Sequence, residues 1–441
     1  MVTDRRRIGL LTAISVVISN MIGTGVFTTL GFQAENIRSV FALLLLWLLG
    51  GIVALSGALC YGELAVRMPR SGGEYTYLSR IFHPAVGFLA GWVSATVGFA
   101  APAALASVAL GRYLAQVIPA FPPLLVAIAT ILLATVVHVA GIRVGGFFQN
   151  LLTGLNVTLI LFLIACGFLL YRSPDFSLTF GESDFKPVLS PIYAVSLVYV
   201  LFAYSGWNGA TYIAGEVKDV SRNLPRSLII GTLVVTFLYL ALNWTFLYTV
   251  PISELAGKVE VGFLSARTIF GAAGARFMTV LLCIALAASA SAFLLAGSRV
   301  AKTMGEDFAR LRVLAVSNQK GTPIRAILAQ AAVAIFLIVT SAFESVLVYV
   351  GFTLSVVTTL TVIGLLRLRH AEGKNREGYS TWFYPITPFV FLALSLWMLL
   401  YSLVNRPVQS LLGLGTVLSG LVIYLLAGPA RVPGNGQKQA P

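Results

Sequence analysis

The chain has 441 residues, of which 58% are hydrophobic and only 10% are charged, and its formal net charge is +14. This composition excludes an ordinary soluble protein and an intrinsically disordered one, and it predicts a polytopic membrane protein. The positive charge does not require a nucleic-acid ligand, because basic residues also gather in the cytoplasmic loops of membrane proteins.

Twelve apolar runs in the chain are long enough to cross a bilayer. A helix rises about 1.5 Å per residue and the hydrocarbon core is about 30 Å thick, so each span needs roughly 20 apolar residues. The predicted spans are residues 9–34, 38–66, 84–108, 123–142, 147–171, 189–214, 227–250, 275–301, 324–342, 345–366, 382–404 and 408–427.

Basic residues are unevenly distributed between the two sides of this topology. With the N-terminus inside, 22 of the 30 Lys and Arg residues lie in inner segments and 8 in outer segments. Positively charged loops remain on the cytoplasmic side. Both ends of the chain, residues 1–8 and 428–441, are therefore predicted to be cytoplasmic.

The first predicted span contains the sequence SNMIGTGVF at residues 19–27. A glycine in a helix interior costs about 1 kcal/mol relative to alanine, and two glycines beside Thr24 favour unwinding. Close helix packing is the alternative, but that motif spaces small residues four apart, whereas Gly23 and Gly25 lie about 200° apart around a helix. Because unwound backbone in a membrane must face protein or a water-filled cavity, the segment predicts a helix break at a binding site.

A second interruption lies in the sixth predicted span, where residues 201–216 read LFAYSGWNGATYIAGE. The pairs Ser205-Gly206 and Asn208-Gly209 fall near its middle. Since the breaks are five spans apart, an odd number, the blocks 9–171 and 189–366 must have opposite orientations in the membrane. Such an inverted repeat, with one broken helix in each half, is typical of secondary transporters. The last two spans, residues 382–427, lie outside the repeat.

The chemistry of the two breaks suits a zwitterion. Free N–H groups and the positive end of a half-helix favour a carboxylate, while unpaired carbonyl groups favour a cation. An α-amino acid carries both poles a few ångströms apart. The backbone can bind both poles without a buried protein charge, and no ionised side chain lies deep in the predicted spans.

Three motifs carry a resemblance to a known family. MIGTGVF (21–27) resembles the Gly-Ser/Thr-Gly signature in helix 1 of the amino acid–polyamine–organocation (APC) superfamily, and YGELAVRMPRSGGEYTYL (61–78) is similar to the first inner loop of these transporters. LFAYSGWN (201–208), followed by EVKDVSRNLPRS (216–227), resembles helix 6 of L-type amino acid transporters. The resemblance covers nearly all of spans 1–10. It implies an all-α fold of 12 transmembrane helices with a LeuT-like 5+5 inverted repeat in which helices 1 and 6 are broken.

The resemblance also implies roles for residues of the first break. The amides of Thr24 and Gly25, with Gly23, would hold the substrate carboxylate. The carbonyl group of Met21 would receive the substrate ammonium group.

Residues of the second break would complete the site. The resemblance implies that the carbonyl groups of Phe202 and Ser205 also receive the ammonium group, and that Phe202 is a thin aromatic gate over the substrate. The alternative for Phe202 is an ordinary core or lipid-facing aromatic. Asn208 would bond either to exposed backbone or to the substrate.

The sequence leaves the coupling ion open between Na⁺ and H⁺. Many prokaryotic relatives have a lysine in helix 5, three residues after a Thr, whose ammonium group resembles a substitute for sodium. Here Asn156 takes that place, and an amide neither carries that charge nor releases a proton. A sodium site would need helix 8 hydroxyl groups, and Ser289 and Ser291 are candidates, although their i,i+2 spacing points them to different faces. No metal or other cofactor is predicted, and exchange or facilitated diffusion stays open.

The residues near the breaks also indicate the substrate class. Ala292 and its small neighbours in ASASAFLLAGSR (288–299) would leave room beside Phe202 for an apolar side chain. No acidic residue is expected to project into the pocket and hold a second ammonium group. We predict transport of neutral L-amino acids, with a cationic amino acid or polyamine transporter of the same superfamily as the alternative.

Cysteine positions bear on the partners. Eukaryotic L-type relatives are bonded to a single-span glycoprotein through a cysteine between helices 3 and 4, but residues 111–123, GRYLAQVIPAFPP, contain none. We therefore expect no disulfide-linked heavy subunit, and a monomer or homodimer in the plasma membrane, which is the inner membrane of a prokaryotic cell. Cys60, Cys166 and Cys283 lie in apolar runs and indicate neither a disulfide nor a metal site.

Two functions of another class also fit a hydrophobic chain. A multi-span membrane enzyme would show paired carboxylates, a reactive His or Cys, or a metal cluster, and no such set is present. A receptor or scaffold gives no reason for two related helix breaks. Glu63 and Glu216 lie near inner helix ends and are interpreted as solvated or loop-bracing carboxylates, with a part in gating as the alternative.

Overall fold

The computed structural model describes residues 8–140, 146–171, 185–188, 190–318, 322–373 and 378–428. Helices form nearly all of this part of the chain, and a parallel β-bridge joins Ile8 to Val217. Each of the twelve predicted spans coincides with a helix or with a run of consecutive helices.

Nine segments of the described chain are long and apolar enough to cross a membrane. They include the helices α4 (Val40–Arg67), α12 (Val220–Thr249), α17 (Phe343–Glu372), α18 (Ile386–Asn405) and α19 (Pro407–Ala427). The others are Leu10–Thr28, Pro84–Ala115, the part Thr153–Leu170 of α9 (Gly146–Leu170), and α14 (Val261–Asp307).

Three further predicted spans are shorter or divided. Two are the apolar helices α8 (Pro123–Val139) and α16 (Ile324–Thr340). The sixth span is split into α11 (Pro191–Tyr204) and the 3₁₀ helix η2 (Gly209–Glu216). A helix divided in this way is too short in either half to span a bilayer by itself.

Spans 1 and 6 are both interrupted near their middles. Span 1 consists of α1 (Leu10–Met21), α2 (Gly25–Thr28) and α3 (Leu30–Ala34), with residues 22–24 outside any helix. Span 6 is unwound between Tyr204 and Gly209. The breaks predicted from the glycine pairs are therefore confirmed.

Span 3 holds an interruption that the prediction of a span at 84–108 did not include. It is formed by α6 (Pro84–Val93), a π-helical segment η1 (Ser94–Gly98) and α7 (Ala100–Ala115). Pro102 explains this interruption of the α-helix. A proline has no N–H group to donate to the carbonyl group four residues earlier, and the proline ring clashes with that carbonyl group. That carbonyl belongs to Gly98, the last residue of η1.

Span 8 begins earlier than predicted. Helix α14 starts at Val261 and bends at Gly271, whose φ of 70° and ψ of −173° lie outside the helical region. The expected span 275–301 starts just after this bend. A glycine permits such a positive φ without a Cβ clash.

Four short helices lie in three of the described linkers between spans. They are α5 (Glu74–Ile81), α13 (Ile252–Leu255), η3 (Ala309–Leu311) and α15 (Arg312–Ala315). Of these, α5 lies in the linker between spans 2 and 3 and packs against α6 and α17.

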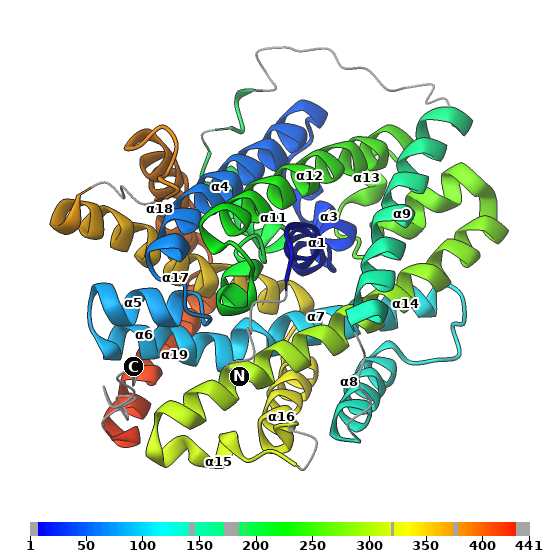
Figure 1. Ribbon diagram of the computed structural model, residues 1–441. Coiled ribbons are helices and arrows are strands. Elements are labelled where there is room, and N and C mark those ends of the chain that lie inside the picture. The colour runs from blue at the N-terminus through cyan, green and yellow to red at the C-terminus, as the bar shows by residue number, and fades with distance from the viewer. Residues whose placement is uncertain are drawn as a thin grey trace.

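The first span lies in the middle of the bundle. Figure 1 shows α1 surrounded by longer helices, and it contacts α12, η2 and α9. Gly231 of α12 makes the approach to α1 possible, because a Cβ there would lie 2.7 Å from Cβ of Val17. The break in span 1 is therefore enclosed by protein, where unwound backbone is tolerated.

Candidate functional site

The break in span 1 exposes backbone donors. Helix α1 ends at Met21, Ile22 departs from the helix with a ψ of 98°, and α2 restarts at Gly25. No described residue accepts a hydrogen bond from the amides of Gly23 or Thr24. The start of the second half-helix thus has free N–H groups, as an anion-binding break requires.

The two glycines of this break have different surroundings. A Cβ on Gly25 would lie 2.4 Å from Cα of Ala203 in span 6, so Gly25 serves close packing. A Cβ on Gly23 would meet nothing nearer than the Phe293 ring at 3.9 Å. Packing, which the sequence offered as an alternative for the whole motif, therefore explains Gly25, whereas a Cβ on Gly23 would fit in ordinary van der Waals contact with Phe293.

The break in span 6 lies against the end of α1. Gly206 has a φ of +100°, and a Cβ there would lie 2.3 Å from the carbonyl O of Asn20. Helix α11 ends just before it, where the Ser205 amide donates to the Phe202 carbonyl group over 3.0 Å. The two interrupted spans thus cross with their unwound backbones in contact.

A cavity of about 100 Å³, which we call the chamber, lies beside this crossing. Its wall comes from spans 1, 2, 3, 6, 8, 10 and 11 and from α5. The residues that line the chamber include Asn20, Glu74, Ser94, Phe99, Phe202, Ser205, Asn208, Tyr212 and Phe293.

The predicted residues of span 6 all line the chamber. Phe202 is 5% exposed and borders it together with Ser205 and Asn208. The prediction placed these three around one ligand, and the structure brings them to one wall.

The predicted residues of span 1 are not among those that line the chamber. Met21 and Thr24 are buried and do not line the chamber, and neither Gly23 nor Gly25 lines it. The Met21 carbonyl group accepts a hydrogen bond from the Tyr239 hydroxyl group over 2.6 Å. It keeps a second lone pair, because a carbonyl oxygen has two.

A carboxylate lines the chamber, and this corrects the expectation that no acidic residue projects into the pocket. Glu74, the first residue of α5, is only 3% exposed. It accepts hydrogen bonds from Asn208 Nδ2 at 2.5 Å, the Tyr212 hydroxyl group at 2.8 Å and the Tyr61 hydroxyl group at 3.1 Å. Among the described residues no Lys, Arg or His forms an ion pair with it. The sequence places Glu74 in a loop, and only the fold brings that loop to the chamber.

The small residues expected to leave room beside Phe202 do not line the chamber. Ala292 does not line the chamber, whereas the ring of its neighbour Phe293 does. None of residues 288–292 lines the chamber, whereas Phe202 and Phe293 both do.

A larger cavity of about 990 Å³, the vestibule, leads to the chamber. Its outer part is lined by Pro69, Ser71, Glu216 and Arg299, at the end of the molecule that the sequence predicts to face the cytoplasm. Four residues line both cavities, namely Asn20, Phe99, Gly209 and Tyr212. The rings of Phe99 and Tyr212 lie 6.1 Å apart between their centroids. The chamber therefore opens toward the predicted inner end.

The coupling candidates do not meet at one point. Ser289 donates to the Ala285 carbonyl group, and Ser291 Oγ lies 2.8 Å from His138 Nε2. Asn156 is 8% exposed, and its Oδ1 has no hydrogen-bond partner among the described residues. None of the three candidates lines either cavity.

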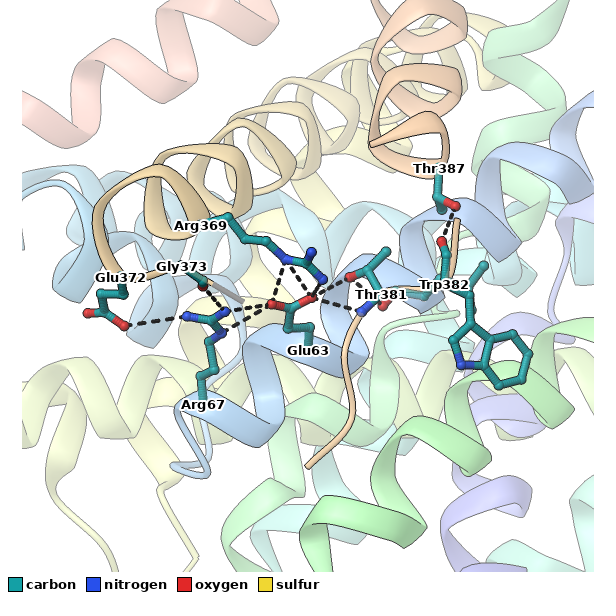
Figure 2. A network of polar contacts seen from close by, with 9 residues as sticks. Glu63, Arg67, Arg369, Glu372, Gly373, Thr381, Trp382 and Thr387 are labelled. Atoms are coloured by element: carbon teal, nitrogen blue, oxygen red, sulfur yellow. Dashed lines mark hydrogen bonds and ion pairs between the residues drawn. The ribbon is translucent and has the colours of Figure 1, made fainter. Parts of the chain in front are cut away.

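Glu63 forms the centre of a buried ionic network at the inner end of span 2 (Figure 2). Its carboxylate is fully buried and lies 2.9 Å from Arg67 Nη2 and 2.5 Å from Arg369 Nη2. The Thr381 amide and hydroxyl group each donate to it over 2.8 Å. Arg67 also donates to the Gly373 carbonyl group over 2.6 Å. Glu63 therefore braces α4, α17 and the linker that precedes α18, as one of the sequence interpretations proposed, but it is not solvated.

Paired helix breaks around a chamber, in a bundle of apolar helices with a vestibule at one end, define a membrane transporter rather than an enzyme. The chain belongs to the amino acid permease family, whose model matches residues 8–427. It is thus an amino acid transporter of the APC superfamily.

Relatives of the chain are also named as amino acid transporters. The chain is 28% identical to "Large neutral amino acids transporter small subunit 2" of Mus musculus, over 96% of this chain and 81% of the relative. It is 27% identical to "b(0,+)-type amino acid transporter 1" of the same species, over 96% and 88% of the two chains. It is also 28% identical to "Asc-type amino acid transporter 1" of Homo sapiens, over 96% and 82%.

Sequence reasoning missed two parts of the site. The π-helical segment of span 3 could have been found from Gly98 and Pro102 within one apolar run. The burial of Glu74 had no local signal, because its donors come from Tyr61, Asn208 and Tyr212.

Proposed function

We propose that the protein moves neutral L-amino acids across the membrane by alternating access, with the substrate held in the chamber. The observation that carries this proposal is the meeting of Phe202, Ser205 and Asn208 with Asn20 around the chamber, which lies at the crossing of span 6 with a span 1 break whose Gly23 and Thr24 amides have no described acceptor. The relatives named for large neutral amino acids support the substrate class.

The substrate's carboxylate would bind at the amides of Gly23, Thr24 and Gly25. The surroundings of Gly23 support this, because the nearest atoms to a Cβ there belong to the ring of Phe293, a chamber residue, at 3.9 Å. The ammonium group would be received by carbonyl oxygens of Met21, Phe202 and Ser205, and the Phe202 ring would cover the substrate.

Other features of the transporter belong to the same proposal. Residues 9–171 and 189–366 would be the two inverted repeats, and both termini would face the cytoplasm of a cell whose plasma membrane holds the protein. We propose no disulfide-linked partner, although some relatives are named as small subunits, because residues 111–123 lack a cysteine. The coupling ion would be Na⁺ or H⁺, or transport would proceed by exchange.

One observation favours a second candidate, transport of cationic amino acids. Glu74 places a carboxylate on the chamber wall with three neutral donors and no basic partner among the described residues. A buried carboxylate in a membrane protein commonly marks a ligand pathway, and a cationic side chain would neutralise it.

Uptake into proteoliposomes separates the two candidates. Radiolabelled alanine, leucine and arginine would be supplied with and without sodium and a pH gradient. Neutral transport predicts uptake of leucine and none of arginine. Cationic transport predicts arginine uptake that falls about tenfold or more in Glu74→Gln, since a charge-assisted contact is lost, with leucine uptake unchanged.

Substitution at Gly23 tests the location of the site. Gly23→Val adds a side chain between the span 1 break and Phe293 without a close Cβ contact, and it is not opposed by a positive φ at Gly23. The protein should therefore fold but bind substrate at least about tenfold more weakly. Gly25→Leu is a poorer test, because its side chain would clash with Ala203. Wild-type uptake by folded Gly23→Val would reject the proposed carboxylate site.

A further inference from the structure

The π-helical segment of span 3 borders the chamber although none of its residues belongs to the two broken helices. Ser94 and Gly98 of η1, and Phe99 directly after it, are chamber residues. Short π-helical turns are frequently found at functional sites. The shape of the chamber at Ser94, Gly98 and Phe99 therefore depends on the contacts that position η1.

Gln330 of span 9 holds the segment from outside the chamber. Its side chain is 1% exposed, and its Nε2 donates a hydrogen bond to the carbonyl group of Ala95, the second residue of η1. It does not line the chamber or the vestibule. A polar side chain buried this deeply in a membrane protein is costly unless it bonds.

A glycine in span 8 makes room for this contact. A Cβ on Gly297 would lie 2.6 Å from Gln330 Oε1 and 2.7 Å from Cβ of Phe99. Spans 3, 8 and 9 therefore meet at this point, and the position of Phe99 is coupled to that of Gln330. Phe99 is one of the residues that line both cavities.

We propose that Gln330 is a positioning residue for substrate binding. Its hydrogen bond to Ala95 holds η1 so that Ser94 and Phe99 form the chamber wall. This inference rests on the proposal that the chamber holds the substrate. Without the bond, the Ala95 carbonyl group loses this donor and the segment can shift, which turns Ser94 and Phe99 relative to the chamber and weakens binding.

The test measures KM and maximal rate of leucine uptake in proteoliposomes, per folded transporter. Gln330→Met keeps the length of the side chain but removes the donor, and it should raise KM about fivefold while the maximal rate changes less than twofold. Gln409→Met is the matched control, because Gln409 lies at the other end of the bundle and, among the residues that the structure describes, its side chain bonds only to Ser345, at 3.4 Å. The control should leave both constants unchanged.

A double-mutant cycle distinguishes positioning from general loosening of the fold. Ser94→Ala should raise KM by itself, and its effect in the Gln330→Met background should be clearly less than additive, because both act through the same wall. If Gln330→Met does not fold, Gln330→Asn retains the amide but shortens its reach, and it should raise KM in the same way.

The outcomes separate this inference from the proposed function. If Phe202→Leu and Ser94→Ala raise KM while both Gln330 variants behave like the control, the positioning role is wrong and the chamber remains the site. If none of these substitutions changes KM, the chamber is not the substrate site and both proposals fail. Additive effects of Ser94→Ala and Gln330→Met would also overturn the positioning role.

Discussion

A single residue, Gly206, permits the two broken spans to cross. Its φ of +100° is available to glycine but strained for other residues. Its Cα faces the Asn20 carbonyl oxygen so closely that any Cβ would lie 2.3 Å from it. Backbone conformation and close approach therefore both require a glycine at this position.

Gly206→Ala should destabilise the protein and abolish transport. A strained φ costs about 1–3 kcal/mol, and the contact with Asn20 must also open. Thermal unfolding in detergent and leucine uptake would measure the two effects.

Gly415→Ala is the control for this substitution, because a Cβ at Gly415 in α19 meets nothing within 4 Å. It should stabilise the protein by about 0.5–1 kcal/mol, the usual gain from alanine in a helix interior. Equal unfolding temperatures for the two variants would contradict the assigned role of Gly206.

The carboxylate of Glu74 lies in a linker of the sequence but is buried among hydrogen-bond donors in the fold. In the sequence it follows two glycines in a linker. In the fold, Tyr61 of span 2 and Asn208 and Tyr212 of span 6 surround it. It therefore connects the linker helix α5 to the inner half of span 6.

At the scale of elements, buried ionic contacts fix the inner end of the bundle. Glu63 of α4 binds Arg369 of α17 and Thr381 of the following linker (Figure 2). The Arg369 guanidinium group also lies 4.0 Å from the centroid of the Tyr384 ring. Three segments that are far apart in the sequence are thus held at one point.

Glu63→Ala should lower the free energy of unfolding by about 3–5 kcal/mol, because it leaves Arg369 buried without its partner. Glu306→Ala removes a surface carboxylate that lies 3.8 Å from Lys302 and is 56% exposed. It should cost less than about 1 kcal/mol. Denaturation of both variants in detergent would compare these values, and a cost for Glu63→Ala near that of the control would show that the network contributes little.

At the scale of the whole molecule, one end is closed and the other is open. Near the start of α17 and the end of α18, Glu344 lies 2.6 Å from Arg406 Nη2 and accepts a hydrogen bond from the Tyr199 hydroxyl group over 2.5 Å. Phe32 stacks on Tyr199 and Phe343 at the same end. The vestibule of about 990 Å³ lies at the opposite end. The structure therefore has the form of a transporter open to one side.

Cysteine labelling would test this arrangement together with the predicted orientation. In a background without Cys60, Cys166 and Cys283, Ala296→Cys should react with a membrane-impermeant maleimide from the cytoplasmic side only, because Ala296 lines the vestibule. Ser341→Cys, at an exposed position between α16 and α17, should react from the outside only. The reverse pattern would show that the predicted topology is inverted.

The sequence by itself determined the features that depend on neighbouring residues. Length of apolar runs predicts where the chain crosses a membrane, and the helices follow those runs. The glycine pairs at residues 23–25 and 206–209 predict the breaks, because helix propensity is a local property. Family motifs within these segments then predict an amino acid transporter.

The tertiary structure alone decided which groups meet. Gln330 and Ala95, Glu63 and Arg369, and Glu74 and Asn208 are each separated by more than a hundred residues. Burial of a polar group and its hydrogen-bond partners depend on how the spans pack, and no pattern within one span encodes that. For this reason the chamber could be anticipated at the breaks, and an interruption of span 3 from Gly98 and Pro102, while the position of Glu74 on the chamber wall and the contact of Gln330 with η1 could not.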